Sequence, residues 1–267
     1  MQIRKEYLLS LNAKERIAKS VIEDALINYM RPTIVWSGGK DSTVVLHLVK
    51  QITETLGQKL PPVLFIDHGD HYPETMQLIR EVSKEWGFNV VVAKNEDVLN
   101  HINDGIIRVD TLSEENQMET RRIGFNEDSF PYSLETDVGN HLLKTVAMNS
   151  AISRYRFDAL FTGVRWDENP ARSTEVFISP RESPYHVRVQ PILPMLEKDI
   201  WEYMFANKLP IHPKYQEGYR SIDGIHDSKK VSDLPAWEQD LNNTQERQGR
   251  SQDKEGMMER LRQLGYM

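Results

Sequence analysis

The chain has 267 residues, of which 27% are charged, and its formal net charge is −7. A chain this acidic is not an obvious nucleic-acid binder, and it holds no apolar run of the roughly 20 residues that a membrane helix needs. These residues include no cysteine, which excludes a disulfide framework, a catalytic thiol, an iron–sulfur cluster and a cysteine zinc site within them. The N-terminus is too polar for a signal peptide, so we expect a cytoplasmic protein.

The N-terminal part of the chain alternates between helical and strand patterns. Apolar residues recur at helical spacing over 11–30 until Pro32, and TIVW (33–36) is a short apolar run typical of a strand buried on both faces. The unit then repeats, with Gly57 and Gly87 at the ends of two further helices. We expect helices at 11–30, 41–57, 73–87 and 96–103, and strands at 33–36, 62–67 and 89–93.

The C-terminal part of the chain is less regular. Residues 104–136 have little periodicity, and we expect them to form a surface insertion or a lid. Beyond them we expect helices at 137–155 and 197–208 and strands at 157–163 and 187–193.

Strands that alternate with helices at this spacing predict an α/β fold with a doubly wound parallel sheet covered on both sides. Right-handed crossovers then bring the loops that follow the strands together at the carboxyl edge, where open α/β sheets bind ligands. We expect one α/β domain over 1–195, which includes the 104–136 insertion. A C-terminal helical and irregular arm over 196–267 is expected to pack on it.

The first strand leads into SGGKDS (37–42), which has the features of an anion site. Gly38 and Gly39 let the backbone approach a phosphate closely, and the helix that follows points free N–H groups at a ligand. Ser37 and Ser42 supply hydroxyl donors. The spacing is not the GxxxxGK[ST] of a Walker loop. The alternative is a plain glycine turn with a Ser or Asp cap.

Lys40 and Asp41 give the loop two opposite charges. Lys40 suits a phosphate, whereas the carboxylate of Asp41 repels one. We therefore expect Asp41 either to cap the helix or to bind Mg²⁺, which takes one or two carboxylates together with substrate phosphates.

Several ordered segments resemble one superfamily. SGGKDS matches the SGGxDS loop of the PP-loop ATP pyrophosphatases, which have the HUP-like adenine nucleotide alpha hydrolase fold. Other stretches resemble the PAPS reductase family and, most closely, the small ATP-binding subunit of ATP sulfurylase. These stretches are FIDHGDHYPET (65–75), LFTGVRWDENPARS (160–173), the segment 189–222 and ERQGRSQDKEGMMERLRQLGYM (246–267).

The absence of cysteine separates the branches of this superfamily. The PAPS reductases use a cysteine nucleophile near the C-terminus, and this chain has none. The same argument disfavours sulfur-transferring tRNA enzymes and the iron–sulfur members that modify DNA. Adenylyl transfer needs no thiol and remains.

The resemblance implies a nucleotidyltransferase that works with ATP and Mg²⁺. An acceptor oxyanion, most favourably sulfate, would attack the α-phosphorus and release pyrophosphate, and sulfate would give adenosine phosphosulfate. The implied catalytic residues are Lys40, Arg165 and Arg172. The implied nucleotide contacts are Ser37, Gly38, Gly39, Lys40, Asp41, Ser42, Asp67, Gly163, Arg247 and Arg250, with Asp41 as the metal ligand.

Partners and acceptors stay open at this point. The resemblance implies a GTPase large subunit or a homo-oligomer as partner, and neither nucleic acid nor membrane. The segment 212–228 is shorter than in the sulfurylase subunit, and Asp223-Gly224 stands where that family has GC. The alternatives are a repurposed relative that uses ATP on another acceptor, FMN adenylyltransferase, or a nucleotide-binding component of a larger assembly, including one of a mobile element.

Two histidine-containing segments have no assigned role. Asp67, His68, Asp70 and His71 include metal-ligand types, but neighbours on one loop rarely all face one ion, so we favour ordinary loop positions. His212 and His226 flank two tyrosines. They predict either a polar loop with aromatic anchors or a substrate contact.

Overall fold

The computed structural model describes residues 4–244 and Glu246. Its helices are α1 (Leu11–Asn28), α2 (Lys40–Thr55), α3 (Pro73–Trp86), α4 (Glu96–Asn100), α5 (Glu114–Arg122), α6 (Asp137–Asn140), α7 (Ala147–Tyr155), α8 (Glu197–Ala206) and α9 (Pro213–Gln216). Its strands are β1 (Pro32–Val35), β2 (Val63–Ile66), β3 (Val90–Ala93), β4 (Ile102–Asn103), β5 (Ile106–Arg108), β6 (Ser129–Pro131), β7 (Ala159–Phe161), β8 (Ile178–Glu182) and β9 (Tyr185–Val189). Helices and strands thus follow the predicted alternation.

The main sheet has the strand order β3-β2-β1-β7-β9-β8. All its neighbours pair in parallel except β8, which pairs antiparallel with β9. The chain builds β1, β2 and β3 outward in one direction and then returns to place β7 on the other side of β1. The order of the strands therefore reverses at β1, where ligands bind in open α/β sheets.

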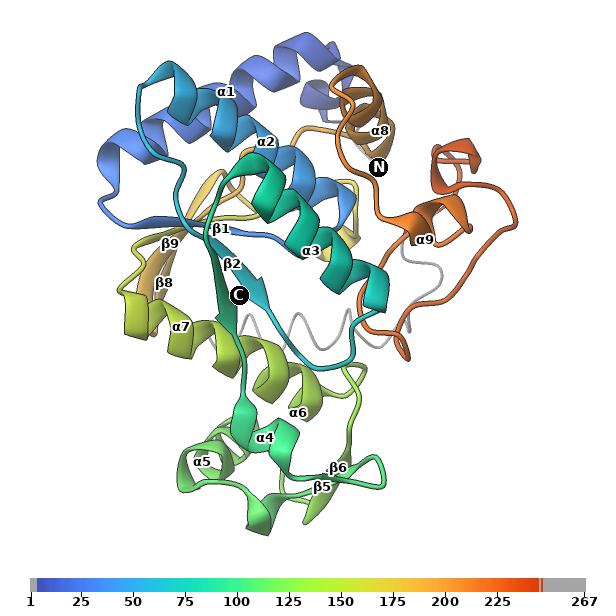
Figure 1. Cartoon of the computed structure of the whole chain (residues 1–267). Helices are drawn as coiled ribbons and strands as arrows, with labels where there is room; N and C mark the ends of the chain where they lie inside the picture. Colours follow the sequence, from blue (N-terminus) through green and yellow to red (C-terminus); the bar gives the residue numbers. More distant parts are fainter. Residues whose placement is uncertain (1–3, 245, 247–267) are drawn as a thin grey trace.

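Helices cover both faces of this sheet (Figure 1). The larger core joins α1, α2, α3 and α8 to one face, and its fully buried residues include Ile22, Val44 and Ile200. On the other face, α7 packs Ala151 and Ile152 against β2, β3 and β7. The predicted doubly wound α/β fold is confirmed. The helix α8, which we placed in the C-terminal arm, contributes directly to the main core.

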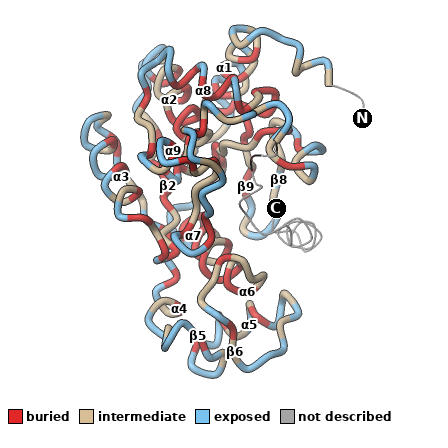
Figure 2. The backbone as a smooth tube through the Cα atoms, turned by 90° about the vertical axis from the view of Figure 1, so that its right-hand side faces the viewer, coloured by how far each residue is buried: buried red, intermediate tan, exposed pale blue. Residues whose placement is uncertain are grey.

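A smaller lobe hangs below the main sheet in Figure 1 and contains α4, α5, α6 and the antiparallel sheet β4-β5-β6. It has a core of its own, which is made of Val98, Ile107, Leu112, Phe130, Leu134, Val138, Leu142 and Leu143. In Figure 2 the backbone of this lobe contains both buried (red) and exposed (pale blue) stretches. The segment 104–136 is therefore part of a folded unit that starts before it and ends after it.

The region predicted as one helix at 137–155 is helical throughout, but with a change of type. The α-helix α6 passes into a π-helical stretch at His141–Val146 and then into α7. In the π-helical stretch, Leu142 and Leu143 face the small-lobe core, whereas α7 packs on the main sheet. The change of winding lies where one continuous element passes from one core to the other.

The strand β8 of the main sheet is not predicted by the sequence pattern, and neither are the small-lobe strands β4, β5 and β6. The residues of β8, ISPRE, include a proline and two charges, and none of them is fully buried. An edge strand tolerates such residues because one of its sides has no ladder to complete. Among the described residues, no helix is both long and apolar enough to cross a membrane.

Candidate active site

The loop after β1 and the loop after β7 meet at the carboxyl edge, where the strand order reverses. The first contains residues 37–39 and leads into α2, and the second contains Gly163 and Arg165. A cavity of about 610 Å³ opens beside them, and Arg165, Glu197 and Arg220 are among its lining residues.

The backbone of the first loop has the conformation that its glycines were predicted to allow. Gly38 has a φ of 78°, a left-handed value that glycine adopts without strain. Gly39 is the N-cap of α2 and makes no side-chain cap hydrogen bond. Asp41 lies in the first turn of α2 instead of capping it, so the cap interpretation of Asp41 is wrong.

Hydroxyl groups tie the loop to the first turn of α2. Ser42 Oγ donates to Gly39 O at 3.0 Å and accepts from Ser37 N at 3.3 Å. Thr43 Oγ1 also donates to Gly39 O and accepts from the indole Nε1 of buried Trp36 at 2.9 Å. The loop is therefore held in shape by its own residues.

Gly163 allows the two loops to touch. A Cβ atom on Gly163 would lie 2.7 Å from Ser42 N and 2.8 Å from the carbonyl carbon of Asp41. Both contacts are with backbone, which cannot rotate away. The β7 loop is therefore in direct contact with the first turn of α2.

Lys40 is buried, with 1% of its side chain exposed, and it faces carboxylates. Its Nζ lies 2.5 Å from Glu246 Oε1, 3.3 Å from Asp41 Oδ2 and 3.9 Å from Glu197 Oε1. It also donates to the backbone oxygen of Arg220 at 3.4 Å. Burial alone would lower the pKa of Lys40, but Asp41 and Glu246 raise it above its ordinary value, so this lysine is a permanent cation.

Each of the three guanidinium nitrogens of Arg165 donates to a carboxylate. Nε donates to Asp167 Oδ1 at 2.8 Å, Nη2 donates to Glu246 Oε2 at 2.5 Å, and Nη1 donates to Asp41. Asp167 in turn accepts from the backbone N–H of Glu197 at the start of α8. Arg165 therefore connects the β7 loop to α2 and α8.

Glu246 joins the two buried cations. One carboxylate oxygen contacts Lys40 and the other contacts Arg165. Burial would raise the pKa of Glu246, but Lys40 and Arg165 together hold it well below the ordinary range. Glu246 is thus ionised at neutral pH, as a bridging anion must be.

A second ion pair and a tyrosine complete the cluster. Arg220 donates to Glu197 Oε2 through Nε at 2.9 Å and through Nη2 at 2.7 Å. Burial and the nearby Glu246 raise the pKa of Glu197, which Lys40 and Arg220 oppose. Tyr215 accepts from the backbone N–H of Lys40 at 3.1 Å, and burial raises its pKa to about 12, so it stays a neutral hydroxyl.

Asp67 lies at the end of the neighbouring strand β2, outside the Lys40 cluster. It pairs with Lys94 at 3.6 Å and lies 3.5 Å from His71 Nε2, and it accepts from the backbone of Gly69 at 3.0 Å. Over residues 4–244 and 246, no group of three or more His, Cys, Asp or Glu could hold a metal ion. The loop interpretation of the 67–71 segment is therefore favoured over the metal interpretation.

The two histidines beside the tyrosines have different surroundings. His212 is buried; its Nε2 lies 2.8 Å from Thr75 Oγ1, and its Nδ1 accepts from Lys214 N. His226 is exposed and contacts Asp70 at 2.7 Å. His212 thus fits the structural interpretation of a polar loop anchor.

Of the remaining predicted residues, the structure describes only Arg172. Arg172 ends a short 3-10 turn and lies 3.7 Å from Glu175, and its charge acts on Arg188 of β9. None of the contacts described for Arg172 joins it to Lys40 or Arg165. Arg247 and Arg250 fall outside the described residues.

Sequence reasoning missed Glu197, Arg220, Tyr215 and Glu246 as members of the cluster. Glu246 is the first residue of the ERQGR stretch, in which the resemblance implies roles for the two arginines. A carboxylate has the wrong charge for a phosphate site, so its charge does not predict a place beside Lys40. The other three lie in segments that no spacing rule connects to the loop.

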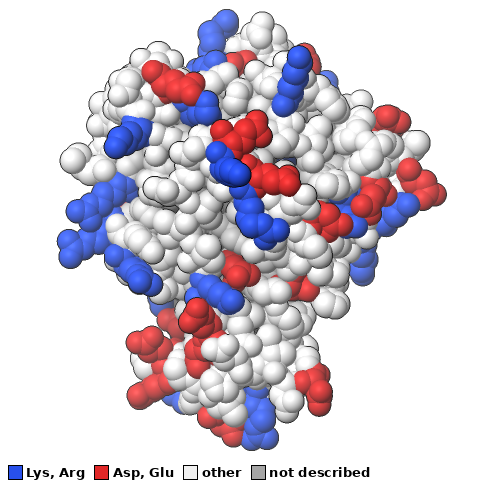
Figure 3. Space-filling model, viewed as in Figure 1, with Lys and Arg blue, Asp and Glu red and all other residues white. Residues whose placement is uncertain are grey.

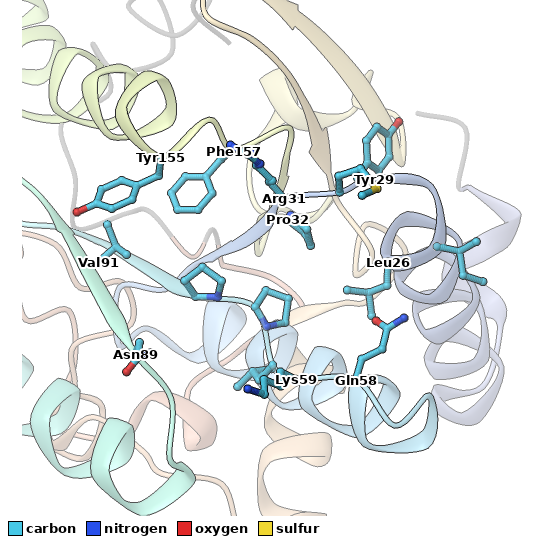
Figure 4. Close-up of a pocket in the computed structure, with 15 residues that line it drawn as sticks. Leu26, Tyr29, Arg31, Pro32, Gln58, Lys59, Asn89, Val91, Tyr155 and Phe157 are labelled. Atoms are coloured by element: carbon cyan, nitrogen blue, oxygen red, sulfur yellow. The ribbon is translucent and has the colours of Figure 1, made fainter.

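A larger groove of about 750 Å³ lies at the opposite, amino edge of the sheet (Figure 4). Its walls come from the ends of α1 and α7 and from the connections that enter β1 and β2. Its lining residues are Leu26, Ile27, Tyr29, Met30, Arg31, Pro32, Gln58, Lys59, Leu60, Pro61, Pro62, Asn89, Val91, Tyr155 and Phe157. It has no acidic lining residue and no histidine.

Most of the face seen in Figure 3 is uncharged; acidic and basic side chains mix near its centre, and several basic side chains lie along its left edge. Neither sign dominates the centre of this face, whereas nucleic-acid binding uses a broad positive surface.

Comparison with protein families gives one assignment over most of the chain. Residues 31–230 match the family described as "Phosphoadenosine phosphosulfate reductase domain". The chain is 26% identical to sulfate adenylyltransferase subunit 2 of Brucella anthropi, over 80% of this chain and 69% of the relative. It is also 26% identical to the protein of the same name from Shewanella amazonensis, over 80% and 70%.

Solved structures show the same fold at lower identity. Yeast FAD synthetase in complex with FAD superposes with a TM-score of 0.63 at 16% identity, covering 94% of this chain and 93% of that one. A PAPS reductase from Candida auris in a phosphate complex gives a TM-score of 0.58 at 18% identity, covering 86% and 99%. These likenesses establish the fold of the site-bearing sheet.

Proposed function

Because the chain belongs to the phosphoadenosine phosphosulfate reductase domain family, we propose that it transfers the adenylyl group of ATP to an oxyanion, with sulfate as the favoured acceptor. The observation that carries the proposal is the convergence of the 37–42 loop, Lys40 and Arg165 where the strand order reverses. The names of the relatives from Brucella anthropi and Shewanella amazonensis support this acceptor.

The triphosphate would lie over the start of α2. The N-terminal turn of α2 and the positive end of its dipole favour phosphate oxygens, and the first N–H of this turn, that of Lys40, donates to Tyr215. Lys40 adds a fixed positive charge beside them, and Ser37 and Ser42 add hydroxyl donors. These groups would hold the β- and γ-phosphates, so that pyrophosphate is stabilised as it leaves.

Arg165 and Arg172 are the proposed contacts for the α-phosphate or the acceptor. A guanidinium fork matches two oxygens of an oxyanion at once. Arg165 is the better placed of the two, because it contacts the carboxylates that surround Lys40. In this proposal the protein positions the reactants and stabilises charge, and the in-line attack of the acceptor breaks the bond between the α- and β-phosphates.

Mg²⁺ fits this site as an ion bound mainly by the nucleotide. Asp41 offers a partly exposed carboxylate in the first turn of α2, which suits an ion that takes one or two carboxylates plus phosphate oxygens. When bound, it would neutralise charge on the leaving pyrophosphate. The metal role of Asp41 and the nucleotide roles of Asp67, Gly163, Arg247 and Arg250 belong to the same proposal.

The cysteine count argues against the thiol chemistry after which the family is named. That chemistry needs a nucleophilic sulfur, and the 267 residues contain none. The word "subunit" in the relatives' names supports an assembly with a further chain. We propose such a partner, in line with the GTPase subunit that the resemblance implies.

The test is pyrophosphate release from ATP and Mg²⁺ with and without sulfate, together with ATP binding measured by calorimetry. We expect sulfate-dependent release, and Lys40→Ala should lower it at least a hundredfold, since it removes a buried charge that faces the phosphates. Lys59→Ala, in the groove at the opposite edge, is the matched control and should change nothing. If pyrophosphate release does not depend on sulfate but increases with FMN, FMN replaces sulfate as the proposed acceptor. If ATP does not bind, the nucleotide site is rejected.

A further inference from the structure

The bridge made by Glu246 has the form of a bound anion. Its two carboxylate oxygens are bonded to the same carbon atom and contact two different cations, Lys40 Nζ and Arg165 Nη2, each at 2.5 Å. The exposed fractions of the three side chains are 5% for Glu246 and 1% each for Lys40 and Arg165. A phosphate group presents oxygens on one centre in the same way, and both cations are ones that the proposed function assigns to phosphates.

Carboxylates occupy donors of both cations while this bridge stands. Each of the three nitrogens of the Arg165 guanidinium donates to a carboxylate. Lys40 contacts Glu246, the Arg220 carbonyl and Asp41. An ATP phosphate can bridge Lys40 Nζ and Arg165 Nη2 in the way that Glu246 does only after Glu246 has left.

Glu246 is the carboxylate best suited to leave. Asp41 is fixed in the first turn of α2, and Asp167 is held by the backbone N–H of Glu197 as well as by Arg165. Glu246 reaches the cluster from 206 positions beyond Lys40 in the sequence, and its described side-chain contacts are with the two cations. Exchanging it for a phosphate keeps both cations paired, so the buried charges stay compensated.

We propose that Glu246 occupies the place of an ATP phosphate in the nucleotide-free protein and is exchanged for that phosphate when the nucleotide binds. The inference rests on the proposed function and adds a residue to it. Glu246 keeps Lys40 and Arg165 close together in the absence of ligand, and it competes with the nucleotide for them. It is a positioning residue that sets the affinity of the site for phosphates.

If Glu246 competes with the nucleotide, its replacement should strengthen phosphate binding. A purely structural residue would not have this effect. Replacing the carboxylate with an amide removes the competing charge and leaves two like charges facing each other. Both changes favour an incoming anion and disfavour the empty protein. Glu246→Gln should therefore bind phosphates more tightly although the unliganded protein is less stable. A residue that only supports the fold, or that holds Mg²⁺, would weaken binding when replaced.

The experiment is calorimetric titration of inorganic pyrophosphate without metal, and of ATP with Mg²⁺, into the full chain. We expect Glu246→Gln to lower both dissociation constants at least tenfold. Glu246→Asp, which keeps the charge but shortens the reach, should lower them less. The matched control is Glu238→Gln, which makes the same change of charge at an exposed position of the same C-terminal region and should have no effect.

The outcomes separate the two proposals. If the wild type binds pyrophosphate through Lys40 but Glu246→Gln binds it equally or more weakly, the exchange is rejected and the nucleotide site stands. If neither the wild type nor the variants bind pyrophosphate or ATP, the proposed function fails and the inference fails with it.

Discussion

The two edges of the main sheet differ in character. The carboxyl edge holds a buried cluster of ion pairs around Lys40 and Arg165, beside a cavity of about 610 Å³. The amino edge holds the larger groove of about 750 Å³, whose walls are mainly aromatic, aliphatic and proline side chains (Figure 4). Size alone would therefore favour the amino edge over the carboxyl edge, where we propose the active site.

The direction of the helices supports the carboxyl edge as the place of the proposed chemistry. α2 begins at the carboxyl edge, so its free N–H groups and positive dipole end lie there. α1 and α7 end at the groove, so carbonyl groups and negative dipole ends lie near it. A phosphate ligand is favoured at the first edge and disfavoured at the second, whatever the volumes of the two cavities.

Removal of Arg165 should have the largest effect on this comparison. Arg165→Gln leaves three buried or half-buried carboxylates without their common cation. We expect the free energy of unfolding to fall by about 3–5 kcal/mol, measured by urea denaturation at pH 7. Lys59→Gln at the amino edge removes the same charge from an exposed site, and a change within about 0.5 kcal/mol is expected. Equal effects at the two edges would contradict the description of the ion cluster as the electrostatic centre.

Acid should destabilise the protein through buried His212, which contacts Thr75 in the first turn of α3. Burial lowers the pKa of His212 from 6.5 to about 4, and Glu74, Lys214 and Glu217 are the charged groups that act on it. Between pH 6.5 and 4, His212 therefore binds a proton in the unfolded chain but not in the folded chain. The stability contribution is complete above pH 6.5 and is lost as the pH falls from 6.5 to 4, by at most about 3 kcal/mol.

The measurement is urea denaturation of the wild type and of His212→Gln at intervals between pH 7.5 and pH 4. We expect the wild type to lose its advantage over the variant as the pH falls, because glutamine does not titrate. Subtracting the two curves of unfolding free energy against pH cancels the contribution of the carboxylates, which both proteins share. A constant difference over this range would show that folding does not shift the pKa of His212.

Contact between the two loops should be sensitive to a single methyl group. Gly163→Ala places a Cβ atom 2.7 Å from Ser42 N, which forces the β7 loop away from α2. We expect a loss of about 1–3 kcal/mol in the free energy of unfolding and a weaker affinity for ATP, because Arg165 moves with its loop. Calorimetry and urea denaturation measure the two effects. If the variant is less stable but binds ATP as tightly as the wild type, Gly163 has no role in the nucleotide site.

Local patterns account for what the sequence predicted well. The strands β1 and β2, the 37–42 loop and α2 depend on neighbouring residues, and apolar runs and glycines reveal them. β8 was missed because an edge strand needs no apolar pattern. Glu246 was missed because its place depends on a contact across 206 positions, and because a carboxylate is not expected where a phosphate binds. The pairing of Arg172 with Glu175, by contrast, is local, because the two residues are three positions apart in the sequence.

The smallest expected effect comes from the groove itself. Tyr155 lies on its wall with 43% of its surface exposed, at the end of α7 and far along the strands from Lys40. We expect Tyr155→Ala to lower the free energy of unfolding by less than about 1 kcal/mol and to leave pyrophosphate release and ATP affinity unchanged. Parallel assays of release and of denaturation measure both. A drop in ATP affinity would mean that the two edges are coupled through the sheet, because the side chain removed has no contact with the ion cluster.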